Sequence, residues 1–498
     1  MTHASMSDLV FKARQKFGTR TALTVIGGAT LSFEEIDQRA GCVAGALAAR
    51  GIGPDDRVVL YLPNGWEWVV AYHAIARLGA VVVPANILLT PEEVAYIAEN
   101  AEARALIVPA ERRGAFETQA QLFTLGKAEA AEEFSVLMEG AYREPVPRNA
   151  DDLFTIGYTS GTTGKPKGAT MTHGAVYASM AGTATIHVRS AQDVVLSSLP
   201  FPHVYGNIVL NCTFLAGSRI ITTTRFDAGE SLRLIGQEKV TLFEGVPTMY
   251  YQMLAHADIN DAQLGSLLRC TVGGQTMPLS KIESVIQRFG CPLLELWGMT
   301  EVAGPAVTHS PYWPARPGSI GLPMPGFEVR RTDLDDPTRD AAADAPGELL
   351  VRGTMVTKSY WRNADATSAT IDADGWLATG DIARADKDGY LYIVDRRKDM
   401  INTAGYKVYP AELEQVIAMH PAVVMVAVAG IADEEKGELA QAFVVSREGS
   451  ELGEEEILTH CRQHLASYKV PRRVLFVADL PRNSTGKILR RSLGELSV

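Results

Sequence analysis

A short glycine-rich stretch contains the first residues with evident chemistry. The segment YTSGTTGKPKG at 158–168 combines glycines, hydroxylated side chains and two lysines. Glycines let backbone N–H groups approach an anion closely, and Ser and Thr hydroxyls add donors. Lys167 adds a cation on a flexible stem. The stretch therefore predicts a phosphate-binding loop, although composition alone leaves a flexible surface loop open as the alternative.

The spacing of the same residues excludes one large class of phosphate-binding protein. A Walker A loop has GxxxxGK followed by Ser or Thr, whose hydroxyl binds magnesium. Here Gly161 and Gly164 are separated by two residues, and Lys165 is followed by Pro166. The chain is therefore not expected to be a P-loop NTPase.

The composition of the whole chain narrows the classes further. A length of 498 residues is too great for a single core and predicts two or more domains. A formal net charge of −11 argues against nonspecific binding to nucleic acid. No apolar run reaches the roughly 20 residues that span a bilayer, and no signal peptide is expected. Five scattered cysteines predict neither a disulfide framework nor a cysteine zinc site, and a cytoplasmic location is expected.

The elements that must position the loop alternate between strands and helices. Between 55 and 300, short apolar runs indicate buried strands: RVVLYLP, AVVVPAN, ALIVP, DVVLSSLP, RIITTTR, VTLFEGVP and LLELWG. Amphipathic stretches at 66–78 and 279–289 indicate helices between some of them. This alternation predicts an α/β fold with mainly parallel sheets flanked by helices.

The pattern changes twice toward the C terminus. Turn signals such as DADGW and DKDGY separate short strands between 320 and 395, which predicts a small antiparallel section. The last hundred or so residues indicate a small α+β unit: helix 411–419, strands 422–430 and 439–446, helix 454–465 and strand 473–478. We therefore expect a large N-terminal domain, residues 1–397, and a small C-terminal domain, residues 398–498.

Six further segments accompany the glycine-rich loop in a fixed order. They are FPHVYG (201–206), GGQT (273–276), WGMTE (297–301), TGD (379–381), DRRKDMINTAGYKVYP (395–410) and NSTGKILRR (483–491). Together with the loop they resemble the adenylate-forming superfamily of acyl-CoA synthetases, luciferases and peptide-synthetase adenylation domains. The chain looks most like bacterial fatty-acid or aryl acyl-CoA synthetases, and the resemblance covers essentially its whole length. It implies a large N-terminal domain with a small mobile C-terminal lid.

The resemblance implies a two-step reaction that uses ATP, Mg²⁺ and coenzyme A. A carboxylate attacks the α-phosphate of ATP to give acyl-AMP and pyrophosphate, and a thiol then displaces AMP. The expected catalytic residues are Lys487, Thr300, Glu301 and His203. Lys487 is the strongest candidate, because its ammonium would stabilise the charge that shifts at the α-phosphate. Thr300 would contact the α-phosphate, and Glu301 would ligate Mg²⁺, a hard cation that prefers oxygen.

The nucleotide site implied by the resemblance draws on segments across the chain. The β- and γ-phosphates would be held by Lys167 and the loop residues Thr159, Ser160, Gly161, Thr162, Thr163 and Gly164. The adenine side would be formed by Gly273, Gly274, Gln275, Thr276, Gly298 and Met299. Trp297 stands where the family more often has Tyr, and stacking on the adenine and packing in the core remain equal alternatives. Asp381 would accept hydrogen bonds from the ribose hydroxyls, with Arg396 as a second ribose or phosphate contact.

The lid contributes the residues expected near coenzyme A. Lys398 matches the family's hinge residue, about which the lid would turn and exchange Lys487 for Gly405. Gly405 has no side chain to obstruct a thin pantetheine arm. The other expected CoA-side residues are Tyr406, Lys407, Tyr468 and Lys469.

The acyl pocket is expected beside the FPHVYG motif. His203 would stand at its mouth, bordering the carboxylate or gating CoA, and the lining would be Tyr205, Gly206, Val209, Gly298, Met299 and Pro305. FPHVYGNIV lacks the Asp that pairs the substrate ammonium in amino-acid-activating relatives, and WGMTEVAGPAVTH lacks a cation for a second carboxylate. The expected substrate is an uncharged-tail monocarboxylic acid, and fatty and aryl/arylpropenoic acids both stay open.

Two other functions stay open at this stage. A stand-alone adenylation enzyme would load a carrier protein in place of free CoA, and a non-catalytic relative would only bind nucleotide. Retention of both Glu301 and Lys487 argues against the second. The expected partners are a small carboxylic acid, ATP and CoA, with no nucleic acid and no transmembrane segment, and a homodimer is compatible with the sequence.

Overall fold

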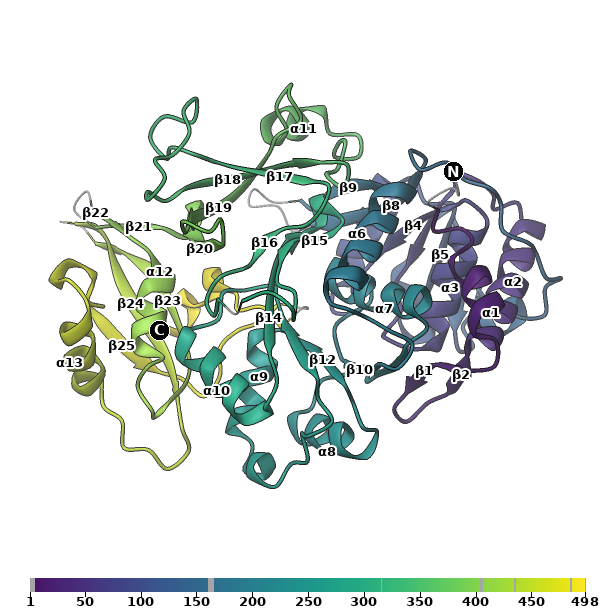
Figure 1. The fold of residues 1–498 in the computed structure, drawn as a ribbon. Helices are drawn as coiled ribbons and strands as arrows, with labels where there is room; N and C mark the ends of the chain where they lie inside the picture. Colours follow the sequence, from purple (N-terminus) through teal and green to yellow (C-terminus); the bar gives the residue numbers. More distant parts are fainter. Residues whose placement is uncertain are drawn as a thin grey trace.

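The chain folds into two large sheets, a small antiparallel sheet and a C-terminal sheet (Figure 1). The computed structural model describes residues 5–159, 165–314, 316–403, 406–433, 436–483 and 486–497. The predicted fold class is confirmed: α/β, with mainly parallel sheets and helices in the N-terminal part, a small antiparallel section and a small α+β C-terminal part.

The first large sheet is parallel except at one edge. Within the described ranges its strands follow the order β7-β6-β5-β3-β4-β8-β9, and only β8 and β9 pair antiparallel. The strands are β3 (Arg57–Leu60), β4 (Val81–Pro84), β5 (Ala105–Pro109), β6 (Gln121–Leu125), β7 (Glu132–Glu133), β8 (Leu153–Thr159) and β9 (Lys167–Thr172). The runs RVVLYLP, AVVVPAN and ALIVP supply β3, β4 and β5, which are continuously apolar because both faces of a parallel sheet are covered.

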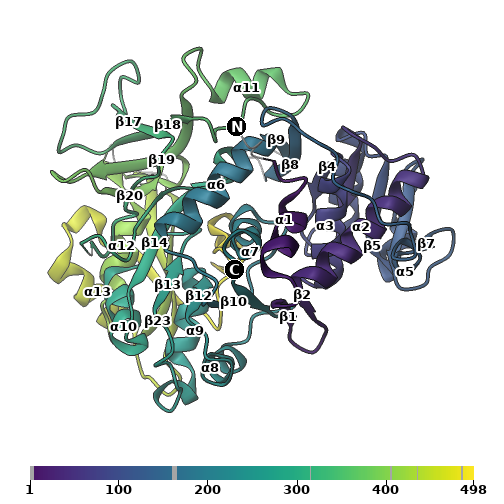
Figure 2. The ribbon, with the colours of Figure 1, turned by 45° about the vertical axis from the view of Figure 1, so that its right-hand side comes forward.

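Helices cover this sheet and begin at residues suited to that position. The helices are α1 (Leu9–Phe17), α2 (Phe33–Ala49), α3 (Trp66–Arg77), α4 (Pro91–Asn100) and α5 (Phe134–Leu137). Ser32 and Glu35 form a capping box at the start of α2, and Thr90 and Glu93 do the same for α4. Figure 2 shows α2 and α3 side by side along the strands. Helix α3 matches the predicted helix 66–78.

The second large sheet carries the middle of the chain. In the part that the structure describes, its order is β16-β15-β14-β13-β12-β10-β11-β1-β2, with a parallel interior from β1 to β14. The strands are β1 (Thr21–Val25), β2 (Thr30–Ser32), β10 (Val194–Ser197), β11 (Arg219–Thr222), β12 (Leu242–Gly245), β13 (Arg269–Val272), β14 (Leu293–Met299), β15 (Gly304–Thr308) and β16 (Leu322–Pro323). The other four predicted strands are β10, β11, β12 and β14.

The helices of this region join the two sheets into one core. They are α6 (His173–Ile186), α7 (Val204–Ala216), α8 (Ala228–Gln237), α9 (Pro247–Ala255) and α10 (Leu279–Phe289), the last as predicted. One apolar cluster contains residues of α2, α3, α6 and α7 together with strands of both sheets. The start of α7 is therefore fixed between the two sheets, and it carries His203 as its N-cap residue.

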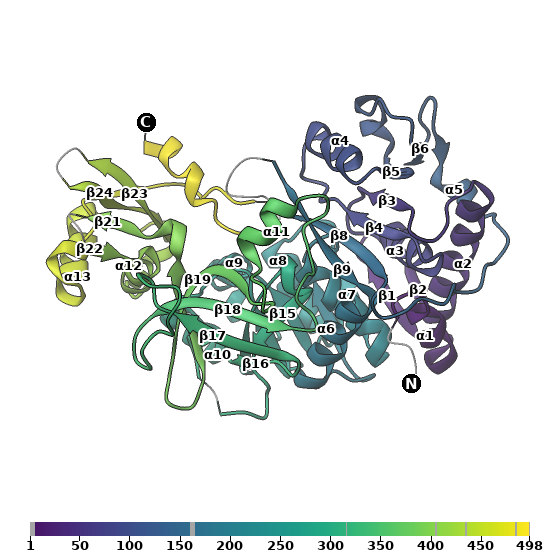
Figure 3. The same ribbon diagram turned by 90° about the horizontal axis from the view of Figure 1, so that it is seen from above.

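The antiparallel section lies where the turn signals predicted it. Strands β17 (Phe327–Thr332), β18 (Gly347–Gly353), β19 (Leu377–Ala385) and β20 (Leu391–Arg396) pair in sequence order, and α11 (Ala364–Thr370) precedes β19. Figure 3 shows β17, β18 and β19 between α6 and the C-terminal sheet. The end of β20 leads through a 3₁₀ turn, Arg397–Asp399, into the C-terminal unit.

The C-terminal unit, called the lid below, packs against the second large sheet. It contains β21 (Ile401–Thr403), β22 (Tyr406–Val408), α12 (Pro410–Ile417), β23 (Val423–Asp433), β24 (Gly437–Ser446), α13 (Glu454–His464) and β25 (Arg473–Phe476). The predicted helices and strands are confirmed, and the β21–β22 hairpin is an addition. Met425, Phe443 and Leu480 of the lid share an apolar cluster with α9 and α10. The domain boundary at Lys398 stays a prediction.

Among the described residues, no helix combines the length and apolar character required to cross a membrane.

Candidate active site

Strand β14 brings the WGMTE motif to the end of the second sheet. Its pairing with β15 shifts register between Trp297 and Gly298, which pair with Val307 and Pro305, so β15 carries one extra residue opposite the start of the motif. A Cβ added at Gly298 would lie 2.0 Å from the carbonyl oxygen of Gly304, so this close approach requires glycine. A 3₁₀ turn, Thr300–Val302, follows directly. It lies against β8, because a Cβ at Gly157 would come within 2.5 Å of the Thr300 methyl carbon.

The predicted phosphate loop falls in the sequence between β8 and β9. Its residues Ser160, Gly161, Thr162, Thr163 and Gly164 lie outside the described residues. The two described ends, Thr159 and Lys167, pair with each other across the hairpin. Lys167 Nζ lies 5.6 Å from the centre of the Tyr360 ring. Lys167, which is predicted to bind phosphate, therefore lies near Tyr360, the hydrogen-bond partner of Glu301.

Glu301 is a buried carboxylate with a tyrosine as its partner. Its Oε1 accepts a 2.8 Å hydrogen bond from the Tyr360 hydroxyl, and only 5% of the residue is exposed. Burial raises the pKa of Glu301, while the Tyr360 hydrogen bond and the charges of Arg396 and Lys167 act in the opposite direction. A cation at this carboxylate would favour its charged form.

Asp381 is held between two donors. The indole Nε1 of Trp297 donates a 2.8 Å hydrogen bond to Oδ2, and Arg396 Nε lies 3.2 Å from Oδ1. Trp297 is buried in an apolar cluster that includes Val302 and Val307. Trp297 therefore packs in the core, which is one of the two alternatives given for it. Its indole also orients Asp381, the carboxylate predicted to bind ribose. The predicted stacking on adenine is not tested by these contacts.

The GGQT segment follows β13 and contacts the lid. Gly273 is closely packed, since a Cβ there would lie 2.4 Å from a methyl carbon of Leu296, whereas Gly274 and Thr276 are exposed. Gln275 Oε1 accepts a 3.1 Å hydrogen bond from the N–H of Ile488, the residue after Lys487. The segment predicted to border the adenine thus also contacts the loop of Lys487, the predicted catalytic residue.

Lys487 lies in a turn that both parts of the molecule hold in place. Its N–H donates to Asn483 Oδ1 at 2.9 Å, and the hydroxyl of Thr248 donates to the carbonyl of Gly486 at 3.0 Å. Burial lowers the pKa of the Lys487 ammonium to about 8; Arg396 acts in the same direction, and Asp381 raises it. The lid therefore holds Lys487 beside the Asp381–Arg396 pair.

Arg490 connects the loop of Lys487 to the start of the lid. Its guanidinium lies 3.3 Å from Asp395 Oδ1 at the end of β20 and 3.3 Å from Asp399 Oδ2 in the following 3₁₀ turn. It also makes paired bonds of 2.8 and 2.7 Å to Glu414 on α12. These four residues are called the Arg490 cluster below. Sequence analysis did not single out Arg490, although it lies within the NSTGKILRR motif.

A cavity of about 580 Å³, its open mouth included, lies between the first sheet and the start of α7. Its lining comes from α3, β4, β8, β9, α6, α7 and the turn after β14: Tyr72, Pro84, Thr155, Gly157, Tyr158, Met171, Val176, Pro202, His203, Val204, Asn207, Thr300 and Ala303. His203 caps α7 by accepting a 3.3 Å hydrogen bond at Nδ1 from the N–H of Tyr205. Burial, and secondarily the charge of Lys487, lowers the pKa of His203 to about 4. The imidazole is therefore neutral near pH 7 and stands between the cavity and Lys487.

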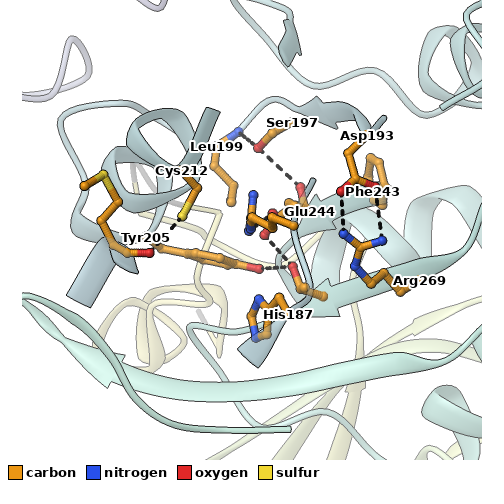
Figure 4. A network of polar contacts seen from close by, with 12 residues as sticks. His187, Asp193, Ser197, Leu199, Tyr205, Cys212, Phe243, Glu244 and Arg269 are labelled. Atoms are coloured by element: carbon orange, nitrogen blue, oxygen red, sulfur yellow. Dashed lines mark hydrogen bonds and ion pairs between the residues drawn. The ribbon is translucent and has the colours of Figure 1, made fainter. Parts of the chain in front are cut away.

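The other residues predicted for the acyl pocket do not line this cavity. The Tyr205 hydroxyl forms a 2.6 Å hydrogen bond with the hydroxyl of Thr271, which donates to Glu244 at 2.6 Å. Figure 4 shows Tyr205 directed into this buried network, where Arg189 pairs with Glu244. Gly206 packs on the backbone of Pro200, Pro305 pairs with Gly298, and Val209 is buried. The structure thus brings His203 and Thr300 to the cavity but leaves Tyr205, Gly206, Val209, Gly298, Met299 and Pro305 outside its lining.

The comparisons with known proteins match this arrangement over the full chain. Residues 10–361 match the AMP-binding enzyme family, and residues 412–487 match the AMP-binding enzyme C-terminal domain. The chain belongs to the AMP-binding enzyme family. Among its relatives are a long-chain-fatty-acid–CoA ligase of Yersinia pestis, 33% identical over 100% of this chain and 95% of that protein, and a 2-succinylbenzoate–CoA ligase of Geobacillus kaustophilus (strain HTA426), 34% identical over 94% of each. A crystal structure of the anthranilate CoA ligase AuaEII in complex with anthranoyl-AMP has a TM-score of 0.92, with 27% identity over 100% of this chain and 98% of that one.

The lid residues predicted near coenzyme A form a separate group on its surface. The rings of Tyr406 and Tyr468 stack with centres 4.7 Å apart, and both side chains are exposed. Lys469 binds Glu412 at 2.6 and 2.8 Å, and Lys407 binds Asp335 at 2.8 Å. Gly405 lies outside the described residues, and Lys398 is exposed in its 3₁₀ turn. The role of these residues near coenzyme A stays a prediction.

Proposed function

We propose that this chain activates an uncharged-tail monocarboxylic acid with ATP, forming the acyl-adenylate and pyrophosphate, and then transfers the acyl group to coenzyme A with release of AMP. Its class, an AMP-forming acid–CoA ligase, follows from relatives that span its full length. The observation that supports this mechanism best is the position of Lys487. The charges of Asp381 and Arg396 shift the pKa of the Lys487 ammonium, and the charge of Lys487 lowers the pKa of His203. His203 in turn lines the cavity.

The chemistry of the first step follows from this group of residues. The acid carboxylate would meet the α-phosphate between Thr300 and Lys487, where the ammonium stabilises the developing charge more strongly than the ground state. Asp381, oriented by Trp297, would accept hydrogen bonds from the ribose hydroxyls. His203 is neutral, so it orients groups through hydrogen bonds and contributes no charge of its own.

Magnesium fits the donor that the chain offers. Mg²⁺ is usually bound through one or two carboxylates together with substrate phosphates and water. No group of three or more potential metal-ligating side chains occurs in the described part of the chain. Glu301 therefore fits as a single carboxylate ligand for a metal that arrives with ATP, and such a metal would neutralise phosphate charge.

Glu301→Gln should weaken magnesium-dependent turnover and leave the stability to unfolding unchanged. If the dependence of turnover on magnesium concentration were the same as in wild type, Glu301 would be excluded as the ligand.

For the second step, we propose that the lid turns about Lys398 and that 1–397 and 398–498 act as the two domains. Lys487 would leave the site, and Gly405 with the Tyr406–Tyr468 pair would approach it. Lys407 and Lys469 now pair with Asp335 and Glu412, so each would exchange a carboxylate partner for a phosphate of CoA.

The lining of the cavity supports an uncharged acid. Among the residues that the structure describes, this lining contains no Lys, Arg, Asp or Glu. A charge buried there without a partner would cost several kcal/mol, so dicarboxylic acids and amino acids should be poor substrates. All the lining residues belong to the part of the chain before Lys398, so a tail held there would stay bound while the lid turns.

A panel of carboxylic acids tests the proposed function. Each acid is scored for pyrophosphate release and for thioester formation with free CoA and, separately, with a carrier protein. Uncharged-tail acids should give both pyrophosphate and acyl-CoA, and Lys487→Ala should lower the rate of pyrophosphate release by about 10²–10⁴. Lys358→Ala, which changes an exposed lysine paired with Asp151, is the matched control and should retain activity. Transfer to the carrier protein alone would favour the stand-alone adenylation enzyme, and no pyrophosphate from any acid would contradict the proposal.

A further inference from the structure

A hydrogen-bonded pair of polar side chains forms part of the lining of the cavity. The Tyr72 hydroxyl on α3 donates a 3.0 Å hydrogen bond to Asn207 Oδ1 on α7, and both residues line the cavity. Asn207 lies four residues after His203, about 6 Å further along the helix axis. Asn211, one turn further on, does not line the cavity. Along α7, the described lining of the cavity therefore extends no further than Asn207, about one helical turn from His203.

Hydrogen bonds hold this pair, called the Tyr72–Asn207 floor below, in place. Asn211 Nδ2 donates to Asn207 Oδ1 at 2.9 Å and lies 3.4 Å from the Tyr72 hydroxyl. Both floor residues are buried. Swinging either side chain aside would leave a buried donor or acceptor without its partner, which is energetically unfavourable. The floor is therefore not a freely moving gate.

Packed aromatic rings lie against the Tyr72 side of the floor. Trp68 stacks on Tyr72 with ring centres 4.9 Å apart and an interplanar angle of 17°. Phe201 lies 5.5 Å from Trp68, and the ring of Phe154 meets Tyr72 edge-on at 5.6 Å. Each of these rings is almost completely buried. A chain that passed the floor would have to displace this aromatic group from the core.

We propose that the Tyr72–Asn207 floor restricts the substrate to compact acids, meaning a single aromatic ring or a short branched or linear chain, and excludes long-chain fatty acids. The inference rests on the proposed function, because it assumes that the acyl tail occupies the cavity. It separates the aryl and fatty classes that the motifs leave open. The carboxylate lies at the Thr300 end, and the tail points toward Asn207.

The wild-type enzyme provides the first test, with benzoate, phenylpropenoate, butanoate, decanoate and hexadecanoate as substrates for acyl-CoA formation. The kcat/KM for the best compact acid should exceed that for hexadecanoate by about 100-fold or more, the scale of misfit in a closed apolar pocket. Equal or better use of hexadecanoate would overturn the inference and leave the proposed function intact. If no acid gave acyl-CoA, the proposed function itself would fail.

Two asparagine variants locate the effect. Asn207→Ala removes part of the floor and should raise the ratio of decanoate to benzoate kcat/KM by about 10-fold, through the KM for the acid. Asn211→Ala disturbs the same hydrogen-bond network without changing the cavity lining and should leave that ratio within about twofold of wild type. Thermal unfolding of both variants checks that they fold. Equal changes in both variants, or a change in Asn207→Ala confined to the KM for CoA, would contradict the assignment of the tail to this cavity.

Discussion

Individual side chains in this site are set by partners distant in the sequence. Lys487 illustrates this, because its pKa of about 8 results from burial and from Arg396, which lies ninety-one positions earlier. The motif containing Lys487 could be recognised from its sequence, and so could Glu301, Asp381 and Arg396. The partner of Glu301 could not, since Tyr360 belongs to no periodic pattern that distinguishes it from ordinary core residues. Only the fold brings it to Glu301.

The lowered pKa of Lys487 predicts a pH dependence of the first half-reaction. The ammonium form stabilises the transition state, so kcat/KM for pyrophosphate exchange should be highest below about pH 8 and fall as the pH rises through that value. Lys487→Arg should show lower activity but no fall near pH 8, because guanidinium keeps its charge. The same alkaline limb in both proteins would assign the titration to another group.

The hydrogen bond from Trp297 to Asp381 predicts an effect on ribose recognition. Trp297→Phe keeps a ring in the apolar cluster but removes the indole donor. The ratio of kcat/KM for ATP to that for 2′-deoxy-ATP should fall about 2- to 10-fold, the range for one hydrogen bond. Trp376→Phe, at a tryptophan stacked on Arg352 elsewhere, is the matched control. If Asp381→Asn lowered the ratio and Trp297→Phe did not, the orienting role of Trp297 would be excluded.

At the scale of elements, the strands and helices followed from local pattern more readily than the site did. The continuous apolar runs predicted β3, β4, β5, β10, β11, β12 and β14, and the lid elements agreed within a few residues. The sequence did not indicate that the Tyr205 side chain would point into a buried network with Thr271. A side chain at the end of a helix between two sheets can point toward either sheet, and the sequence pattern does not fix which. The acyl lining proposed from the motif therefore differed from the lining of the cavity.

Through the Arg490 cluster, one side chain links the loop of Lys487 to β20, to the 3₁₀ turn after it and to α12. Arg490→Lys keeps the charge, but one ammonium cannot replace paired bonds to Glu414 while reaching Asp395 and Asp399. Adenylation should fall at least about 10-fold, and stability should decrease by about 1–3 kcal/mol as buried acceptors lose partners. Arg491→Lys changes the exposed neighbouring arginine and should alter neither rate nor chemical denaturation. Equal behaviour of the two variants would show that the cluster does not position the Lys487 loop.

At the scale of the whole molecule, the lid contacts the larger part at defined places. Gln275 and Thr248 hold the Lys487 loop, and Lys281 Nζ on α10 donates to the carbonyl of Val423 at 2.6 Å. These contacts hold the Lys487 loop against the larger part, as the proposed adenylation step requires. We infer that transfer to coenzyme A requires these contacts to break, and this makes the two half-reactions separable by mutation.

The most direct test of the central claim measures both half-reactions in Lys487→Ala. Pyrophosphate exchange reports the first step, and acyl-CoA formation from preformed acyl-AMP reports the second. The account predicts a loss of about 10²–10⁴ in the first, the scale of one transition-state electrostatic contact, and a change of less than about threefold in the second. An equal loss in both half-reactions would contradict a lid that removes Lys487 before transfer to coenzyme A.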